Sequence, residues 1–201
     1  MSITTQYPII KELESNNSRL FKEDVIKREA EEENIDFFEG CKLALDPMVS
    51  FGVKQVPERS DIDGQGLSWG EFCDLADQLM KRELTGHAAR DAIAEAMLQS
   101  HDAEWNKWYR RILIKDLRCG VSEKTINNVV KKVNKDFTIP VFKCMLAHDS
   151  ANHEKKLVGE KLLDYKLDGV RVLAIYDADS DSVTMYSRNG KQFINFGHIE
   201  K

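Results

Sequence analysis

The chain has 201 residues, of which 42% are hydrophobic and 31% charged, and its formal net charge is −5 at pH 7. This length accommodates one or two domains, and the apolar fraction is sufficient for packed cores. Taken as a whole, the negative charge argues against a nucleic-acid partner, because such partners prefer a basic surface.

The cysteines and the hydropathy of the chain exclude several further classes of protein. No two cysteines form a Cys-x-x-Cys pair, so we expect reduced thiols and neither a zinc site nor a disulfide framework. No apolar run approaches the length of a membrane span, and the polar start of the chain lacks the hydrophobic segment of a secretory signal. We therefore expect no membrane partner and a cytoplasmic location, in the cytoplasm of the host cell if the source is viral.

The beginning of the chain has the pattern of helices followed by a loop. Apolar residues recur at helical spacing over residues 9–14 and 18–38, which predicts one helix in each segment. Several glycines and Pro57 then indicate a loop over residues 51–66.

Three further helices are expected in the middle of the chain. Ser68 and Glu71 have the spacing of a capping box, which predicts a helix over residues 68–84. An alanine-rich helix is expected over residues 85–99, and a third over residues 102–118. The residues expected to face the core are Phe72, Leu75, Ala76 and Leu79 in the first helix, and Trp105, Trp108, Tyr109, Ile112 and Leu113 in the third.

One stretch of the chain is strongly basic, although the net charge of the whole chain is negative. Between Trp105 and Lys135 the chain has nine basic residues against two acidic ones. Gly120 is expected to end the preceding helix and Ser122 to cap the next, over residues 123–134. The free N–H groups at such a helix start bind phosphate, so this junction is a candidate surface for a nucleic-acid backbone. The alternative is an exposed basic helix pair without function. The cations around the junction are Arg111, Lys115, Arg118 and Lys124.

The character of the sequence changes from residue 137. The polar stretch 148–156 indicates a linker, and residues 162–194 have the pattern of strands, with a turn at 177–181. This acidic turn lacks the glycine and the glutamate of a calcium-binding loop, so we expect a plain hairpin turn.

The most informative motif is Lys-Leu-Asp-Gly-Val-Arg at residues 166–171, followed by Ser-Arg-Asn-Gly at residues 187–190. A lysine amine attacks a phosphate only when deprotonated, so its pKa must be lowered by desolvation or by a nearby cation such as Arg171. The Asp-Gly pair permits a tight turn through which backbone approaches a ligand. The alternative is ordinary hairpin-turn chemistry, with a strand on either side of the Asp-Gly pair.

The pattern Lys-x-Asp-Gly-x-Arg resembles the first signature of the covalent nucleotidyltransferases, in which the lysine is the catalytic nucleophile. Residues 82–89 and 118–125 are similar to the N-terminal DNA-binding domain of ATP-dependent DNA ligases, especially those of large tailed bacteriophages. Met-Leu-Ala at residues 145–147 resembles the element that precedes the nucleotidyltransferase domain in this family. The resemblance covers the chain from about Ser68 onwards.

This resemblance implies a mixed fold in three parts. An all-α DNA-binding domain is expected at residues 1–136, a linker and domain entry at 137–160, and the beginning of an α+β, ATP-grasp-like nucleotidyltransferase domain at 161–201. The family continues well beyond the second signature. The chain therefore resembles a truncated, N-terminal fragment of a ligase, and we expect the 201 residues alone to lack ligation activity.

The resemblance also implies roles for individual residues. Lys166 would form the adenylyl-lysine, and Asp168 would orient that lysine and help to hold a metal. Arg171 and Arg188 would contact the nucleotide and its phosphates. Asp164 stands where the family usually has Glu or Gln near the adenine amine, with a shorter side chain. The expected DNA contacts are Thr85, Gly86, His87, Arg111, Lys115, Arg118, Gly120, Val121, Ser122 and Lys124.

Together these residues imply an ATP-dependent DNA ligase that acts as a monomer, with ATP and Mg²⁺, on nicked duplex DNA. The lysine would take AMP from ATP and pass it to the 5′-phosphate of the nick, and AMP would leave as the 3′-hydroxyl attacks. The alternatives are an RNA ligase or capping-type nucleotidyltransferase, which shares the hexapeptide, and a non-catalytic DNA-binding module.

Overall fold

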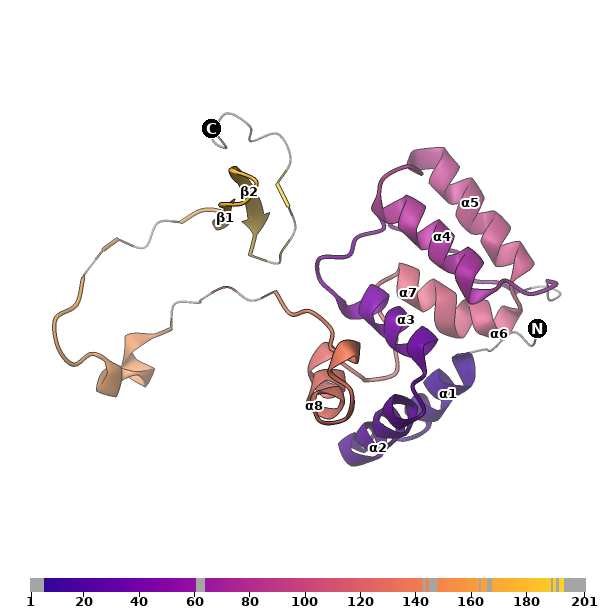
Figure 1. Ribbon diagram of the computed structural model, residues 1–201, viewed down its shortest axis with the longest axis horizontal. Coiled ribbons are helices and arrows are strands. Elements are labelled where there is room, and N and C mark those ends of the chain that lie inside the picture. Colours follow the sequence, from indigo (N-terminus) through magenta and orange to yellow (C-terminus); the bar gives the residue numbers. More distant parts are fainter. Residues whose placement is uncertain are drawn as a thin grey trace. The chain divides into compact units, whose positions relative to one another are not determined.

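The computed structural model describes residues 6–60, 64–142, 144, 148–162, 164–165, 168–188, 190 and 192–193. The chain divides into two units, Met1–Val141 and Phe142–Lys201 (Figure 1). The first unit is helical, and the second contains a two-stranded antiparallel sheet. The helical character expected for the first part of the mixed fold is thus confirmed. Within the described residues, no helix has both the length and the apolarity to cross a membrane.

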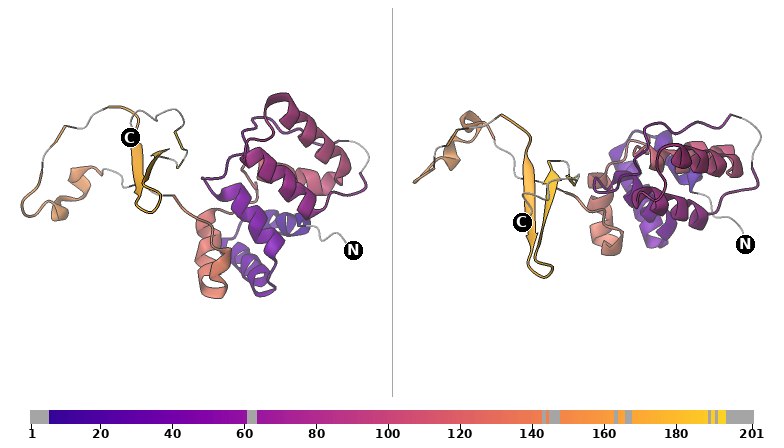
Figure 2. Two further views of the ribbon diagram at one scale, coloured as in Figure 1. Left: turned by 45° about the horizontal axis from the view of Figure 1, so that its top comes forward. Right: turned by 90° about the horizontal axis from the view of Figure 1, so that it is seen from above.

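The helices of the first unit enclose one aromatic core. They are α1 (Tyr7–Ser15), α2 (Arg19–Glu31), α3 (Ile35–Leu45), α4 (Trp69–Met80), α5 (Gly86–Gln99), α6 (Asp102–Glu104), the π-helix η1 (Trp105–Tyr109), α7 (Arg110–Leu113), α8 (Glu123–Val133) and the 3₁₀ turn η2 (Lys135–Phe137). The run α6–η1–α7 is continuous, and α2 and α8 lie side by side (Figures 1 and 2).

The single helix expected over residues 18–38 is wrong, because the chain breaks between α2 and α3. Glu33 adopts a left-handed conformation with φ of 52°, and Asn34 N donates to Glu29 O at 3.0 Å, which closes the end of α2. The Asn34 side chain then accepts from Phe37 N at 3.3 Å and caps α3. The break lets both helices turn their apolar residues inward, since Ile26 and Phe37 are fully buried.

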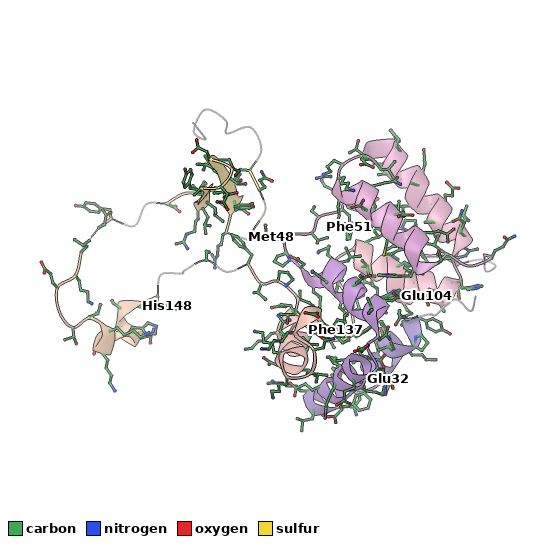
Figure 3. All side chains as sticks on the ribbon, in the orientation of Figure 1. Glu32, Met48, Phe51, Glu104, Phe137 and His148 are labelled. Atoms are coloured by element: carbon green, nitrogen blue, oxygen red, sulfur yellow. The ribbon has the colours of Figure 1, made fainter. Side chains whose placement is uncertain are left out.

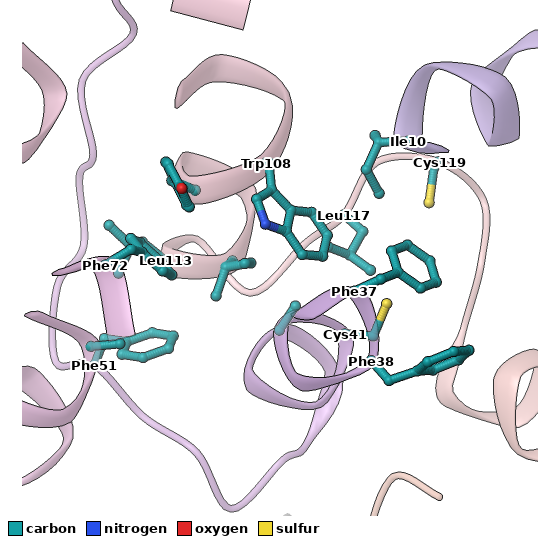
Figure 4. Packing of buried hydrophobic residues seen from close by; sticks show 14 of the residues in the cluster. Ile10, Phe37, Phe38, Cys41, Phe51, Phe72, Trp108, Leu113, Leu117 and Cys119 are labelled. Carbon is teal, nitrogen blue, oxygen red and sulfur yellow. The ribbon is translucent and has the colours of Figure 1, made fainter. Parts of the chain in front are cut away.

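The core is organised around Trp108, whose side chain is fully buried (Figure 4). Its ring stacks on Phe37 with centroids 5.8 Å apart, and Trp69 lies at 6.0 Å. A Cβ added to Gly40 of α3 would lie 2.6 Å from Trp108 Cη2 and closer still to Cζ2, so only glycine permits this approach of helix to ring. At the edge of the core, Phe137 stacks on Phe38 at 4.3 Å and attaches η2 to α3 (Figure 3).

The helix expected over residues 102–118 ends at Leu113, so its predicted end at Gly120 is wrong. Lys115 N donates to Ile112 O and Asp116 N to Arg111 O, both at 3.0 Å, which closes the helix, and Arg111 Nη1 donates to Leu117 O at 2.7 Å and holds the chain against it. Lys115 and Arg118 then adopt φ values of 62° and 51°. The residues between α7 and α8, 114–122, therefore form a long link rather than a tight junction.

Other helix limits follow the sequence pattern. The capping box is confirmed, because Ser68 Oγ accepts from Glu71 N at 3.3 Å while the Glu71 carboxylate accepts from Ser68 N at 2.9 Å. The predicted cap of α8 is confirmed as well, since Ser122 Oγ accepts from Thr125 N at 3.4 Å. The predicted core residues Phe72, Leu75, Ala76, Leu79, Trp105, Trp108, Tyr109, Ile112 and Leu113 are all buried.

In the second unit, strands β1 (Val172–Asp177) and β2 (Ser182–Ser187) form an antiparallel hairpin. The predicted turn at residues 177–181 is confirmed. The Asp177 carboxylate accepts from Asp179 N at 3.0 Å and from Ser180 Oγ at 2.7 Å, which holds the turn and lowers the Asp177 pKa. Short 3₁₀ turns occupy Ser150–Asn152 and Glu154–Lys156 within the predicted linker.

The contact between α3 and the Trp108 ring predicts opposite effects of two glycine substitutions. We expect Gly40→Ala to lower the free energy of unfolding by about 1–3 kcal/mol, because the added methyl group clashes with a ring that has no room to move. Gly70→Ala, in α4, meets nothing within 4 Å and should stabilise the protein by about 0.5 kcal/mol. Urea unfolding of the whole chain measures both. A Gly40→Ala protein as stable as wild type would show that the ring is not tightly held.

Candidate nucleic-acid interface and adenylation signature

The α7–α8 link is fixed by cationic side chains that donate to backbone carbonyls. Lys22 Nζ of α2 donates to Cys119 O at 2.7 Å, and Arg111 Nη1 donates to Leu117 O at 2.7 Å. Lys115 Nζ donates to Leu43 O at 2.8 Å and to Asp46 O at 2.6 Å. These bonds satisfy carbonyls that have no helical or sheet partner, so the link has a defined shape.

Arg111 belongs to the interior of the unit. Its side chain is 7% exposed and also pairs with Glu14 Oε1 of α1 at 2.6 Å, while Lys107 Nζ contacts the other Glu14 oxygen at 2.9 Å. Burial raises the pKa of the Glu14 carboxyl, but the hydrogen bonds from Lys107 and Arg111 outweigh it, so the pKa is lowered. Arg111 thus connects α1, α7 and the link.

Lys115 is half-buried, with its ammonium group 5.9 Å from the centre of the Phe51 ring. Burial lowers the pKa of the Lys115 amine to about 8, and the nearby Asp46 opposes this shift. The amine is already engaged by two carbonyls. Lys115 and Arg111 therefore position the predicted interface, although the sequence pattern groups them with its DNA contacts.

The exposed residues of the link are the ones suited to a phosphate backbone. Arg118, Gly120 and Lys124 are exposed, and among the described residues the Arg118 side chain forms one loose ion pair, with Asp116 at 3.8 Å. Gly120 has φ of 68°, and a Cβ there would lie 2.5 Å from Lys22 Nζ, so the position requires glycine. Ser122 is exposed and Val121 partly exposed beside them.

The second predicted DNA-binding segment forms the start of α5. Thr85, Gly86 and His87 are all exposed, and Gly86 has φ of 56° with nothing near its Cα. The Thr85 side chain makes no capping bond within the described residues. Its hydroxyl group and the first N–H groups of α5 therefore face solvent in an open segment.

A loop that sequence reasoning treated as a plain connection lies between these two segments. Residues 52–57 and the N-terminal part of α5 line a groove of about 830 Å³ that includes Gly86 and Arg90. A second groove of about 370 Å³ includes Arg118. Lys54, Gln55 and Val56 line both. The sequence offered one sign that this loop could bind an anion, the lysine Lys54 between Gly52 and Pro57.

In the second unit, the hairpin register places one residue from each of the two predicted adenylation motifs at the same end of the sheet. Val172 pairs with Ser187, so Arg171 and Arg188, the next residues outward, lie at the same open end of the hairpin. Arg171 Nη1 approaches Cys144 Sγ at 3.6 Å, and the same sulfur atom lies 3.8 Å from Arg188 O. Residues far apart in sequence are thereby joined at one end of the sheet.

The structure describes two further predicted site residues of this unit, Asp164 and Asp168. Asp164 and Asp168 are exposed, and Asp164 Oδ1 accepts from Tyr165 N at 2.7 Å. Lys166 and the Met-Leu-Ala element at residues 145–147 lie outside the described residues. Within the described part of the chain, no three Asp, Glu, His or Cys side chains gather as metal ligands. A single carboxylate such as Asp168 suits Mg²⁺, which is commonly held by one or two carboxylates together with substrate phosphates.

Comparisons with known proteins relate the chain to DNA ligases. It is 35% identical over 68 residues to DNA ligase 4 of Arabidopsis thaliana, a match that spans 34% of this chain and 5% of that protein. It resembles the solved structures named Pmar-Lig_PreS3 and Pmar-Lig_Pre, each at 58% identity over 96% of this chain, with TM-scores of 0.82 and 0.81. The chain spans 44% of each of those structures. No family model matches it.

Lys115 should give the protein a pH-dependent stability. Its amine has a pKa of about 8 in the folded chain, whereas that of the unfolded chain has the ordinary value of about 10.4. Because the unfolded chain binds more protons at this amine between these values, the contribution of Lys115 to the free energy of unfolding should rise as pH increases from about 8 to about 10.4. The buried thiols of Cys41, Cys73 and Cys119, whose pKa values burial raises, contribute in the opposite direction in both proteins. Urea unfolding at several pH values should therefore show a difference between the wild type and Lys115→Met that grows in favour of the wild type across this range.

Lys11→Met provides the matched control, since Lys11 is an exposed lysine of α1 and should leave the wild-type profile unchanged. Parallel profiles for the wild type and Lys115→Met would mean that Lys115 titrates at an ordinary value.

Proposed function

We propose that this chain contains the DNA-binding part and the beginning of the adenylation part of an ATP-dependent DNA ligase of bacteriophage type, which seals nicks in duplex DNA. The observation that carries this proposal is the meeting of Arg171 and Arg188 at one end of the hairpin. Arginine side chains at this end would suit the phosphates of a nucleotide, because a guanidinium group presents paired donors to phosphate oxygens. The relation to DNA ligases favours this reading over an RNA ligase or a capping enzyme.

Lys166 is the proposed nucleophile. Its neutral amine attacks the α-phosphate of ATP, a nitrogen–phosphorus bond forms, and the bond to pyrophosphate breaks. The AMP then passes to the 5′-phosphate of the nick and leaves when the 3′-hydroxyl attacks. Arg171 and Arg188 neutralise charge that develops on the transferred phosphate. Asp168 orients the amine and supplies one carboxylate to Mg²⁺, which when bound offsets phosphate charge.

The helical unit is proposed to hold the duplex by its backbone. Arg118 and Lys124 contact phosphates directly, with N–H groups at the start of α8 beside them. Thr85, Gly86 and His87 supply the second contact segment. Arg111 and Lys115 act indirectly, because their bonds to backbone carbonyls set the shape of the link. We propose that the protein works as a monomer in the cytoplasm, that of the host cell if the source is viral.

The nucleophile is tested in a hybrid ligase in which residues 1–201 replace the matching segment of one of the similar ligases. We expect the hybrid to acquire a covalent label from α-labelled ATP with magnesium, and Lys166→Ala to abolish the label because only this lysine lies in the signature. Lys161→Ala, at an exposed lysine nearby, should retain it. Denaturing gels provide the readout. Label that persists in the Lys166→Ala hybrid would refute the assignment.

The 201-residue chain alone should bind duplex DNA without sealing nicks. The solved structures that it matches are more than twice as long, and phosphoryl transfer depends on positioning and charge groups spread through a complete site. Backbone binding releases counterions, so the affinity should fall steeply with salt, and Arg118→Gln or Lys124→Gln should weaken binding and flatten that dependence.

Fluorescence anisotropy with a labelled nicked duplex measures the affinity, and a gel assay measures sealing. Robust sealing by the chain alone would contradict the first expectation. A chain without duplex affinity even at low salt would contradict the second.

A further inference from the structure

We propose that residues 52–57, together with Arg82 and Arg90, form one continuous phosphate-binding surface with Arg118. This surface would hold a single stretch of duplex backbone between the start of α5 and the α7–α8 link. The inference rests on the proposed function and assigns a third DNA-contacting element, which we name the 52–57 loop.

The first support is the way cationic side chains divide between two roles. Those that hold the interior donate to carbonyls or pair with carboxylates: Lys22, Lys107, Arg110, Arg111 and Lys115. In contrast, the side chains of Lys54, Arg82 and Arg90 are exposed and make no hydrogen bond or ion pair with any residue that the structure describes. An exposed cation without a protein partner loses nothing within the protein when it meets a phosphate.

The second support is continuity. The two grooves share Lys54, Gln55 and Val56, so the 52–57 loop forms a common wall between Arg90 on one side and Arg118 on the other. Arg82 lies against the start of this loop, since a Cβ added to Gly52 would be 2.6 Å from its guanidinium carbon atom. The two DNA-binding segments expected from sequence are thus parts of one surface.

The charges of this surface favour an anion. The acidic residues that line the two grooves are Asp91 and Asp116, against the cations Lys54, Arg90 and Arg118, while Arg110, which also lines the second groove, is paired with Glu58 at 3.1 Å. Asp116 accepts from Arg118 N at 3.0 Å, and its looser side-chain pair with Arg118, at 3.8 Å, is exposed enough for a phosphate to displace.

The third support is the rigidity of the residues that continue this loop. Trp105 Nε1 donates to Pro57 O at 2.9 Å, and Arg110 Nε donates to Val56 O at 2.9 Å. Asn106 bonds both backbone groups of Arg59, accepting from its N at 3.0 Å and donating to its O at 2.9 Å. A loop held in this way needs little further ordering when it binds, so its contacts contribute to affinity with a small entropic loss.

The lining residues indicate which nucleic acid fits. The described residues that line the two grooves include no aromatic side chain, whereas proteins that bind single strands stack bases on aromatic rings. Cations in an open groove without such rings suit the regular backbone of a duplex. The surface should therefore prefer duplex DNA to a single strand and should be indifferent to base sequence.

The test compares Lys54→Gln and Arg90→Gln with Lys11→Gln in the full 201-residue chain. Lys11 is also exposed and without a partner among the described residues, but it lies on α1 and lines neither groove. Each phosphate contact releases about 0.9 counterion, so each surface variant should lose about eightfold in affinity at 0.1 M salt and reduce the salt slope by about one. Lys11→Gln should keep the wild-type slope, and Lys54→Arg should restore it.

Anisotropy titrations with a nicked 30-base-pair duplex, and with a single strand of the same length, measure these slopes, and thermal unfolding checks that each variant is folded. Suppose that the wild-type chain binds duplex DNA and that Lys54→Gln and Arg90→Gln both keep its salt dependence of binding. This result would refute the proposed surface and leave the proposed function unaffected. A wild-type chain that binds no duplex at low salt would overturn both. Equal affinity for the single strand would overturn the duplex assignment.

Discussion

The π-helical turn at Trp105–Tyr109 is the feature on which the helical unit depends. Arg110 N bonds to Trp105 O, five residues back, so the turn is one residue wider than in an α-helix. In a regular α-helix, Trp105 and Arg110 would point about 140° apart, at 100° per residue. The wider turn brings them to one side, where both donate to the loop at Val56 and Pro57. Trp108 meanwhile stays in the core against Phe37.

One turn of helix thereby joins the core to a segment that has no regular structure of its own. Backbone carbonyls in such a segment need partners when buried, and here side chains of the π-helix and of the surrounding helices supply them. Tyr109 Oη donates to Leu67 O at 2.9 Å, and in the opposite direction Arg59 Nη1 of the segment donates to Ser100 O at the end of α5, at 2.8 Å. The same device fixes the α7–α8 link through Lys22 and Arg111. Both surfaces assigned to DNA are therefore loops held by side-chain donors.

Local sequence patterns correctly predicted the elements that are stabilised by contacts between residues close in sequence. The Ser68 capping box, the apolar stripe of α4 and the hairpin turn after Asp177 depend on neighbours in sequence, and the structure contains them. The end of α7 at Leu113 depends on the left-handed conformation of Lys115, whose amine is held by the carbonyls of Leu43 and Asp46, 72 and 69 residues away in sequence, and no local pattern encodes such contacts. The roles of Arg111 and Lys115 were hidden for the same reason. The sequence does not distinguish a buried lysine or arginine from an exposed one, because their burial is decided by tertiary packing.

Lys115 also shows what a lysine needs before it can act as a nucleophile. An exposed amine keeps a pKa of about 10.4, so only about one in 2,500 is neutral at pH 7. Burial of the Lys115 amine lowers its pKa to about 8, which raises the neutral fraction at pH 7 to about one in ten. The residues that flank Lys166 are far more open, since Tyr165 is 92% and Val170 79% exposed. If Lys166 is the nucleophile, as proposed above, its activation would require groups other than these neighbouring residues to cover it, and a bound nucleotide would be suited to that task.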